Sequence, residues 1–452
     1  MNISPSLIAK YEQPLPRYTS YPTVPFWKTD EFDQREAFRR LESQMLQNSE
    51  VSIYIHLPYC ESLCTFCGCN RRITKNHSVE EPYINALLEE WRLLQLRMPV
   101  HPVITHLHLG GGTPTFFSPR NLERMINHIV GAHKLSETYE FSIEVHPNTC
   151  TFQHIDTLAD LGFRRISVGI QDFDPKVQYI INRNQTFEKT REIIDYAREK
   201  GFTGVNVDLV YGLPLQTLES IRLTLDKVAK IQPQRIAYYA YAHVPWKSKA
   251  QRRYSEEDLP SASEKITMFL SARQLLMEQG YNQVGMDHFA LPDDGLTLAW
   301  SANRLHRNFM GYTTDSTRTL IGLGASSISD FYGAYIQNLK ETEAYIHAIS
   351  QGTLPIERGH ILSDRDIAIR KCIMNVMCNR KIYFPKDIFS HDHLEYIIAT
   401  IESFIQDEAL IWDGESLTPT DFGQLILRNI AAIFDSYLFE KGLTENMFSK
   451  SV

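Results

Sequence analysis

The middle of the sequence alternates between short apolar runs and longer amphipathic segments, and this rhythm constrains the fold more than any other feature. Runs rich in β-branched and aromatic residues lie at 51–56, 104–109, 139–145, 165–170, 203–210 and 235–241. Segments with helical spacing of apolar residues lie between them, for example at 79–97, 121–133, 191–200 and 218–230. This order predicts parallel βαβ units with right-handed crossovers. Six such units are typical of a partial (β/α)6 barrel or an open doubly wound sheet, and periodicity does not choose between them.

Two regions without this rhythm flank the α/β core. Residues 1–50 include LPRYTSYP (15–22), which predicts an irregular N-terminal tail and lead-in. Residues 351–452 carry helical patterns at 363–378 and 393–406, which predict a small, mostly helical C-terminal domain. A chain of 452 residues is long for one average domain. We therefore expect a tail (1–50), a central α/β domain (51–350) and a helical domain (351–452).

The composition is that of a globular protein and argues against some classes of partner. Hydrophobic residues make up 43% of the chain, and the formal net charge is −8, which gives no general attraction to nucleic acid. No apolar run is long enough to span a bilayer, and residues 1–22 do not resemble a secretory signal. We expect a cytoplasmic protein whose seven cysteines serve metal or redox chemistry, or the core, rather than a disulfide framework.

Chemically distinctive residues follow the predicted strands. A cysteine loop comes after the first strand and GGGTPT (110–115) after the second. Glu144, Gln171 and Asp208 lie at the ends of the next three strands, and YAHVP (241–245) ends the sixth. Ligands bind at the carboxyl ends of parallel strands in both candidate architectures. The sequence therefore predicts one binding site along this rim.

The cysteine loop YCESLCTFCGCNR (59–71) contains Cys60, Cys64 and Cys67 in a C-x3-C-x2-C pattern, followed by Cys69. Zinc sites usually combine two close ligands with two distant ones, and no second C-x-x-C occurs in the chain. Thiolates also hold iron–sulfur clusters, in which four cysteines fill every iron of a cubane. Spacing alone leaves open a closed four-cysteine site or a three-cysteine cluster with one open iron.

The cysteine pattern, with Phe66 just before its last cysteine, resembles the radical S-adenosylmethionine superfamily. The resemblance implies that Cys60, Cys64 and Cys67 hold a [4Fe–4S] cluster whose open iron binds S-adenosylmethionine. One electron then cleaves this cofactor to a 5′-deoxyadenosyl radical. GGGTP (110–114) would contact its methionyl part, and glycine suits that task because its backbone can approach a ligand closely.

Further segments narrow the resemblance to the oxygen-independent coproporphyrinogen III oxidase family, also called coproporphyrinogen III dehydrogenase. They are PRYTSYPT (16–23), YIHLP (54–58), CTFCGCN (64–70), HLGGGTPT (108–115), SIEVHP (142–147), VGIQDF (168–173), NRN (182–184), VDLVYGLP (207–214), YAHVP (241–245), GMDHFA (285–290) and LHRNF (305–309). The family oxidatively decarboxylates two propionates of coproporphyrinogen III to vinyl groups, giving protoporphyrinogen IX in haem biosynthesis. The resemblance also implies a partial (β/α)6 barrel of the radical S-adenosylmethionine type, a low-potential electron donor such as a flavodoxin, and a monomer.

The resemblance assigns residues to two S-adenosylmethionine molecules. The molecule on the cluster would be surrounded by Tyr54, Gly111, Glu144 and Ile328, and the second by Phe66, Gly112, Thr113, Gln171, Arg183, Asp208 and Ala242. The side chains suit these roles, because carboxylates accept hydrogen bonds and arginine binds a carboxylate bidentately. Tyr54 could lie against the sulfonium, and we count Tyr54 and Cys69 as catalytic candidates. The alternative for each residue is a structural hydrogen bond or an ordinary ion pair.

Competing interpretations are a haem-binding chaperone, another radical enzyme that acts on a tetrapyrrole, and a passive four-cysteine metal protein. Cys69, the PRYTSYPT tail and GMDHFA favour the oxidase over the chaperone. The substrate of the family carries four propionates, and the candidate cations that would bind them are Arg17, Lys247 and Arg307. We expect His106 and His108 to pack on the sheet rather than bind a metal. His146 stands where the resemblance leads us to expect an acidic residue.

Overall fold

The computed structural model describes residues 4–442 and 447–450, and its centre is a sheet of twelve strands. Neighbouring parallel strands follow the order β13 (Leu320–Leu323), β1 (Glu50–Leu57), β4 (Val103–Gly111), β5 (Lys134–Val145), β6 (Arg165–Gln171), β7 (Gly204–Tyr211) and β8 (Arg235–Ala240). All six predicted strands are present, and each pairs with its neighbour in chain order. The predicted α/β fold with parallel βαβ units is confirmed.

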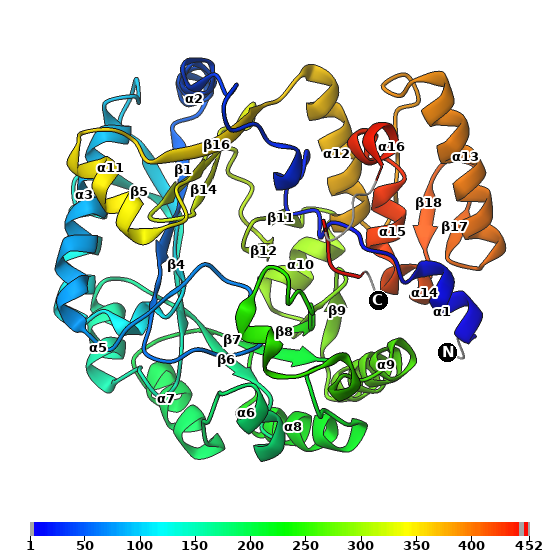
Figure 1. The fold of residues 1–452 in the computed structure, drawn as a ribbon, viewed down its shortest axis with the longest axis horizontal. Helices are drawn as coiled ribbons and strands as arrows, with labels where there is room; N and C mark the ends of the chain where they lie inside the picture. Colours follow the sequence, from blue (N-terminus) through cyan, green and yellow to red (C-terminus); the bar gives the residue numbers. More distant parts are fainter. Residues whose placement is uncertain (1–3, 443–446, 451–452) are drawn as a thin grey trace.

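Helices surround the parallel strands on the outside (Figure 1). They are α3 (Glu80–Gln95), α4 (Pro119–Val130), α5 (Phe152–Asp160), α6 (Pro175–Ile180), α7 (Phe187–Glu199), α8 (Leu218–Ile231) and α9 (Ala262–Glu278). Their apolar faces share one core with the strands, which are buried along most of their length. Local signals set the boundaries, as at α8, where Thr217 and Ser220 form a capping box.

Short antiparallel strands extend the sheet at both ends. Strands β10 (His288–Ala290) and β9 (Asn282–Val284) follow β8, and β14 (Ile328–Asp330), β15 (Ala334–Asn338) and β16 (Ile356–Ile361) follow β13. Helix α11 (Thr342–Ser350) connects β15 to β16, and α10 (Gly295–Ser301) and the hairpin of β11 (His306–Asn308) and β12 (Gly311–Thr313) precede β13. The helical C-terminal region was expected to begin at residue 351, but β16 lies on the main sheet, so helices follow only after residue 361.

The C-terminal region is mostly helical, with α12 (Asp364–Cys378), α13 (His391–Gln406), α14 (Asp421–Leu425), α15 (Leu427–Ala432), α16 (Ser436–Lys441) and the hairpin of β17 (Leu410–Trp412) and β18 (Leu417–Pro419). It shares a second apolar core with the N-terminal tail, through Tyr11, Tyr18 and Tyr21. The tail carries α1 (Pro5–Tyr11) and α2 (Gln34–Gln47) and is largely irregular between them. Figure 1 shows it crossing in front of the C-terminal helices. No helix among the described residues is long and apolar enough to cross a membrane.

Candidate active site

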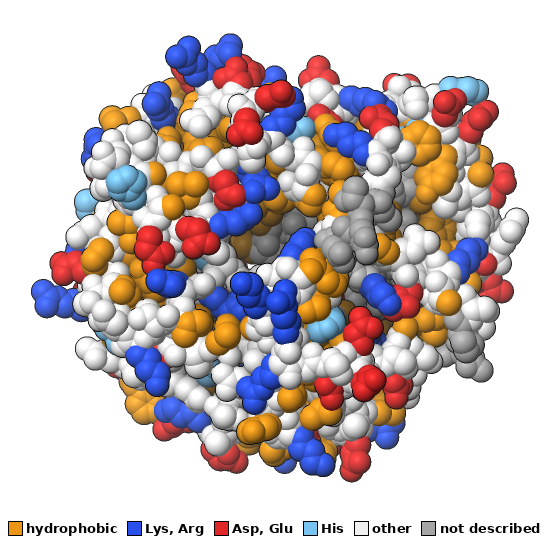
Figure 2. Space-filling view, in the orientation of Figure 1, with side chains coloured by type: hydrophobic (Ala, Val, Ile, Leu, Met, Phe, Trp, Pro, Cys, Tyr) orange, Lys and Arg blue, Asp and Glu red, His pale blue; other side chains and the backbone are white. Residues whose placement is uncertain are grey.

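A cavity of about 830 Å³ lies inside the barrel, lined by the cysteine loop and by residues from β4 to β8. Figure 2 shows the hollow in this face of the molecule, with Lys and Arg side chains gathered beside it. The predicted site residues that line the cavity are Cys60, Cys64, Phe66, Cys67, Cys69, Gly111, Gly112, Thr113, Glu144, Gln171, Arg183, Asp208 and Ala242. The residues expected along the rim therefore line a single cavity.

Among the residues assigned to the cluster and to S-adenosylmethionine, Tyr54 and Ile328 are the two that do not line this cavity. The Tyr54 hydroxyl is 3.0 Å from Nδ1 of His56, and its ring stacks on that of His108, which does line the cavity. Ile328 lies on β14 and packs against a small cluster that contains Trp27 and Tyr335. Tyr54 is therefore linked to the site by its contacts with His56 and His108, whereas the Ile328 side chain packs beside the N-terminal tail.

Two short strands, β2 (Tyr59–Cys60) and β3 (Arg72–Ile73), bracket the cysteine loop. Backbone contacts from distant segments hold it in place. The Thr65 N–H donates to the carbonyl of Ile181 at 2.9 Å, just beyond α6. The side-chain amide of Gln251 donates to the carbonyl of Phe66 at 3.0 Å. The thiols therefore sit on a loop that the barrel fixes from both sides.

Hydrogen-bond donors point at two of the thiols of the C-x3-C-x2-C pattern. The Thr113 hydroxyl donates to Sγ of Cys60 at 3.3 Å, and Nη1 of Arg183 donates to Sγ of Cys64 at 3.6 Å. Donors of this kind stabilise thiolates and set the properties of thiolate-bound clusters. Burial raises the pKa of Cys60 to about 11, so a bound metal would have to displace its proton.

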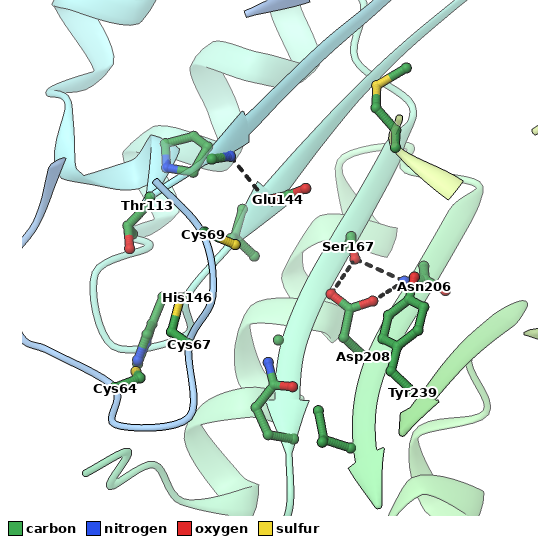
Figure 3. Close-up of a pocket in the computed structure, with 18 of the residues that line it drawn as sticks. Cys64, Cys67, Cys69, Thr113, Glu144, His146, Ser167, Asn206, Asp208 and Tyr239 are labelled. Atoms are coloured by element: carbon green, nitrogen blue, oxygen red, sulfur yellow. Dashed lines mark hydrogen bonds between the residues drawn. The ribbon is translucent and has the colours of Figure 1, made fainter. Parts of the chain in front are cut away.

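Cys69 differs from the other three cysteines of the loop. Its side chain is exposed to the cavity, and Figure 3 shows it beside Glu144, whereas Cys64 and Cys67 lie near His146. A hydrogen bond with the Cys69 thiol lowers the pKa of Cys67. Among residues 4–442 and 447–450, no three His, Cys, Asp or Glu side chains converge on a position for a single metal ion.

The glycine turn after β4 packs tightly against the cysteine loop. A Cβ on Gly112 would lie 2.5 Å from the carbonyl oxygen of Pro58, and the Gly112 N–H donates to the carbonyl of Leu57 at 2.8 Å. Gly111 has a φ of +113°, and a Cβ there would lie 2.6 Å from the ring of His56. Both positions therefore require glycine, and the turn presents bare backbone to the cavity.

Glu144, at the end of β5, is held by donors from the neighbouring strand β4. Its Oε2 accepts from the Gly111 N–H at 3.2 Å, and its Oε1 is 3.3 Å from Nε2 of His108 (Figure 3). The other ring nitrogen of His108 is 2.7 Å from the hydroxyl of Ser142. His106 also lines the cavity, 3.3 Å from Asp315. The two histidines thus have separate oxygen partners and line the barrel interior.

Asp208 lies across the cavity in a polar pocket. The Ser167 hydroxyl donates to its Oδ2 at 3.0 Å, and the Asn206 amide donates to its Oδ1 at 2.8 Å (Figure 3). Burial, and then the charge of Glu144, raise the pKa of Asp208 to about 6. A carboxylate in this setting accepts hydrogen bonds readily above that pH.

Sequence reasoning missed several residues of this polar lining: His108 as a partner of Glu144, and Ser142, Ser167 and Asn206. Each lies two positions before a residue of a recognised motif, on the same strand. Alternate residues of a strand face the same side of the sheet. This period of two was the signal that could have identified them.

Arg183 follows α6 and is buried at the cavity wall. Its Nη2 donates to the carbonyl of Gly169 at 2.6 Å, and its Nε donates to Gln185 at 3.2 Å. Within the described part of the chain it forms no ion pair with a carboxylate. Burial, and then the charge of Arg183, lower the pKa of His146 to about 3, so this histidine stays neutral. The guanidinium therefore keeps its charge available for an anionic ligand.

The candidate substrate cations are placed unequally. Arg17 lines the cavity and donates from Nη2 to the carbonyl of Ala240 at 3.0 Å. The guanidinium of Arg307 lies 4.5 Å from the Tyr312 ring centroid, and its Nε donates to the carbonyl of Arg17 at 3.4 Å. Its buried Nη1 has no hydrogen-bond partner among the described residues. Lys247 is exposed and outside the cavity lining. Arg17 thus lines the cavity, and Arg307 lies directly behind it.

Comparisons with known proteins agree across the whole chain. The Radical SAM superfamily model matches residues 54–228. Oxygen-independent coproporphyrinogen III oxidase of Synechocystis sp. is 37% identical over 461 residues, covering 100% of this chain and 98% of its own. The protein of that name in Pseudomonas aeruginosa is 37% identical over 456 residues, covering 99% and 98%. The solved structure of coproporphyrinogen III oxidase (HemN) from Escherichia coli, described as a radical SAM enzyme, matches with a TM-score of 0.87 and 34% identity, covering 94% of this chain and 100% of its own.

Proposed function

The chain belongs to the family of oxygen-independent coproporphyrinogen III oxidases, and from this membership we propose how its cavity acts on coproporphyrinogen III. The protein is a radical SAM enzyme that oxidises coproporphyrinogen III anaerobically in haem biosynthesis. Two propionates become vinyl groups, with loss of carbon dioxide, and the product is protoporphyrinogen IX. The observation that carries the proposal is that three thiols of one loop, a glycine turn and an arginine without a carboxylate partner in the described chain all line one cavity.

Cys60, Cys64 and Cys67 would hold the [4Fe–4S] cluster. The donor set fits, because three thiols of one loop line the cavity and the side chains of Thr113 and Arg183 donate to two of the sulfurs. Three ligands leave one iron open for a cofactor. Cys69 is then free of the cluster, and its thiol lies in the cavity for a role toward the substrate or the second cofactor.

Two S-adenosylmethionine molecules would fit the polar groups of the cavity. Glu144, Gly111 and Tyr54 would surround the molecule on the cluster, since the carboxylate can accept hydrogen bonds from an amino group. Arg183 and Asp208 would hold the second through its carboxylate and ribose hydroxyls. Phe66, Gly112, Thr113, Gln171 and Ala242 would complete that pocket, and the assignment of Ile328 rests on the family resemblance.

When bound, the cluster and S-adenosylmethionine supply a 5′-deoxyadenosyl radical that takes a hydrogen atom from the β-carbon of a propionate. The chain must place that carbon and keep water away from the radical. Arg17 and Arg307 would bind propionate carboxylates that do not react, because they bring positive charge to the tail side of the cavity. We further propose that the protein works in the cytoplasm, which the free cysteines of the described chain support. From the family we also propose a monomer that a low-potential donor such as a flavodoxin reduces.

The direct test is anaerobic reconstitution with iron and sulfide, followed by a reductant, S-adenosylmethionine and coproporphyrinogen III. We expect protoporphyrinogen IX and carbon dioxide to form together. Cys64→Ser should abolish this turnover, whereas Cys372→Ser, which removes a buried thiol of α12 far from the motif, should retain it. Stoichiometric haem binding without decarboxylation would instead identify a haem chaperone.

A further inference from the structure

A short surface segment carries a concentration of positive charge that the proposed chemistry does not use. Lys247, Lys249, Arg252 and Arg253 lie within seven residues, and all four side chains are exposed. None of them forms an ion pair with a carboxylate in the described chain, and none lines the cavity. We call these four residues the basic segment. It stands out on a chain whose formal net charge is −8.

The basic segment packs directly on the cysteine loop. The hydroxyl of Ser248 donates to the carbonyl of Cys67 at 3.3 Å, and the buried Gln251 donates to the carbonyl of Phe66 at 3.0 Å. The segment includes the 3-10 helix η4 (Lys249–Arg253). Exposed cations therefore sit one hydrogen bond away from the backbone of a proposed cluster ligand.

Exposed aromatic rings adjoin these charges. Trp246 is 43% exposed at the start of the segment, and Tyr179 is 68% exposed on α6. The guanidinium of Arg253 lies over the Tyr179 ring, 5.4 Å from its centroid. The residues that follow α6 also hold the cysteine loop through the bond between Thr65 and Ile181. Arginine and aromatic residues are enriched in protein interfaces, and a cluster of cations speeds association with an acidic partner.

We propose that the basic segment, with Trp246 and Tyr179, is the docking surface for an acidic protein that delivers single low-potential electrons to the cluster. The inference rests on the proposed function, which requires such electrons. The step moves one electron from the reduced donor to the cluster, so the donor is oxidised, the cluster is reduced and no bond forms or breaks. The location explains why cations outside the substrate cavity lie against the loop of Cys67.

The test measures cluster reduction by a reduced acidic flavodoxin in stopped flow, with Lys249→Glu/Arg253→Glu as the variant. The second-order rate constant at low ionic strength should fall about tenfold or more. The wild-type rate should fall with added salt, and the variant rate should depend on salt much less. Photoreduced deazaflavin, a small reductant that needs no docking surface, should reduce both proteins equally.

The matched control is Arg222→Glu/Lys230→Glu, which reverses two exposed cations on α8. Flavodoxin should reduce the cluster of this control at the wild-type rate. A loss of rate equal to that of Lys249→Glu/Arg253→Glu would overturn the proposal. A raised KM for coproporphyrinogen III with unchanged reduction by flavodoxin would also overturn it, because the segment would then serve the substrate. Cluster reduction is followed by absorbance without substrate. A protein that is reduced normally but does not decarboxylate would therefore contradict the proposed function and not the docking surface.

Discussion

The carboxylate of Glu144 accepts a hydrogen bond from the backbone N–H of Gly111 at 3.2 Å, which joins the ends of two neighbouring strands at the cavity. The same carboxylate lies over Gly110, where a Cβ would be 2.9 Å from Oε1. Glu144 therefore reaches its position because the last residues of β4 are glycines. The same residues therefore join two strands of the fold and are the ones proposed to contact the cofactor.

Removal of the negative charge of Glu144 should weaken cofactor binding with little effect on stability. Glu144→Gln keeps an oxygen for the Gly111 N–H but loses the charge-assisted bond to a bound amino group, worth about 1.5–3 kcal/mol. We expect the Kd for S-adenosylmethionine to rise about tenfold or more by calorimetry on the reconstituted protein. Glu137→Gln, an exposed change on the same strand, is the control. An unchanged Kd would show that Glu144 is structural.

The glycine turn should not tolerate a methyl group at its tightest point. Gly112→Ala would place Cβ 2.5 Å from a backbone oxygen that cannot move aside, so unfolding free energy should fall by about 1–3 kcal/mol. Gly68→Ala, in the cysteine loop, meets nothing within 4 Å and should change it by less than about 0.5 kcal/mol. Urea denaturation of the two variants checks this, and equal stability would contradict the close packing.

Three of the four cysteines of the loop should bind the cluster, and Cys69 should not. Serine at Cys60, Cys64 or Cys67 should reduce the iron and sulfide bound after reconstitution, because each thiolate is assigned to one iron. Cys69→Ser should bind iron like the wild type and still cleave S-adenosylmethionine. Iron analysis with electron paramagnetic resonance makes the comparison. Loss of the cluster from Cys69→Ser would favour four-cysteine ligation.

The negative charge of the buried Asp208 should lower the stability of the fold at neutral pH. Burial raises the pKa of Asp208 from 3.8 to about 6, so the folded state holds this proton more tightly than the unfolded state does. Its contribution therefore favours folding at acidic pH and is lost as pH rises through about 6. Asp208→Asn should gain about 1–3 kcal/mol over the wild type at pH 8 and little at pH 4.

The stability gain at Asp208 should come with a loss of function, because the variant lacks a full carboxylate for ribose hydroxyls. Thermal unfolding at the two pH values measures the first effect, and S-adenosylmethionine binding measures the second. Asp226→Asn, on the exposed side of α8, should show neither. A stability difference that is the same at pH 4 and pH 8 would exclude the buried charge as its cause.

Arg17 should matter for the tetrapyrrole and not for the cofactor. Arg17→Ala removes a cation that lines the cavity and should raise the KM for coproporphyrinogen III about tenfold, since a charged hydrogen bond contributes about 1.5–3 kcal/mol. The Kd for S-adenosylmethionine should stay the same. Arg35→Ala, exposed on α2, is the control. An unchanged KM would place the propionates elsewhere.

The six central strands and their helices were predictable because their signals are local. Periods of two and 3.6 residues, capping residues and turns mark these six strands and the helices between them. Strands such as β9, β10 and β14 have only three residues each, which is too short to show a period of two. Their membership of the main sheet depends on how the rest of the chain folds, as when β10 pairs with β8. These strands were therefore not predicted, and β16 was placed in the wrong region.

The sequence by itself determined the family, the cysteine pattern and the rim on which the site residues lie, because motif spacing is a property of the chain. Only the tertiary structure decided which groups meet across that rim. The bond from Arg183 to Cys64 spans 119 positions, and the bond from Ser248 to Cys67 spans 181. Such pairs form because the curved parallel sheet brings successive strand ends around one cavity. The neutral state of His146 and the raised pKa of Asp208 depend on burial, which arises only when that cavity closes.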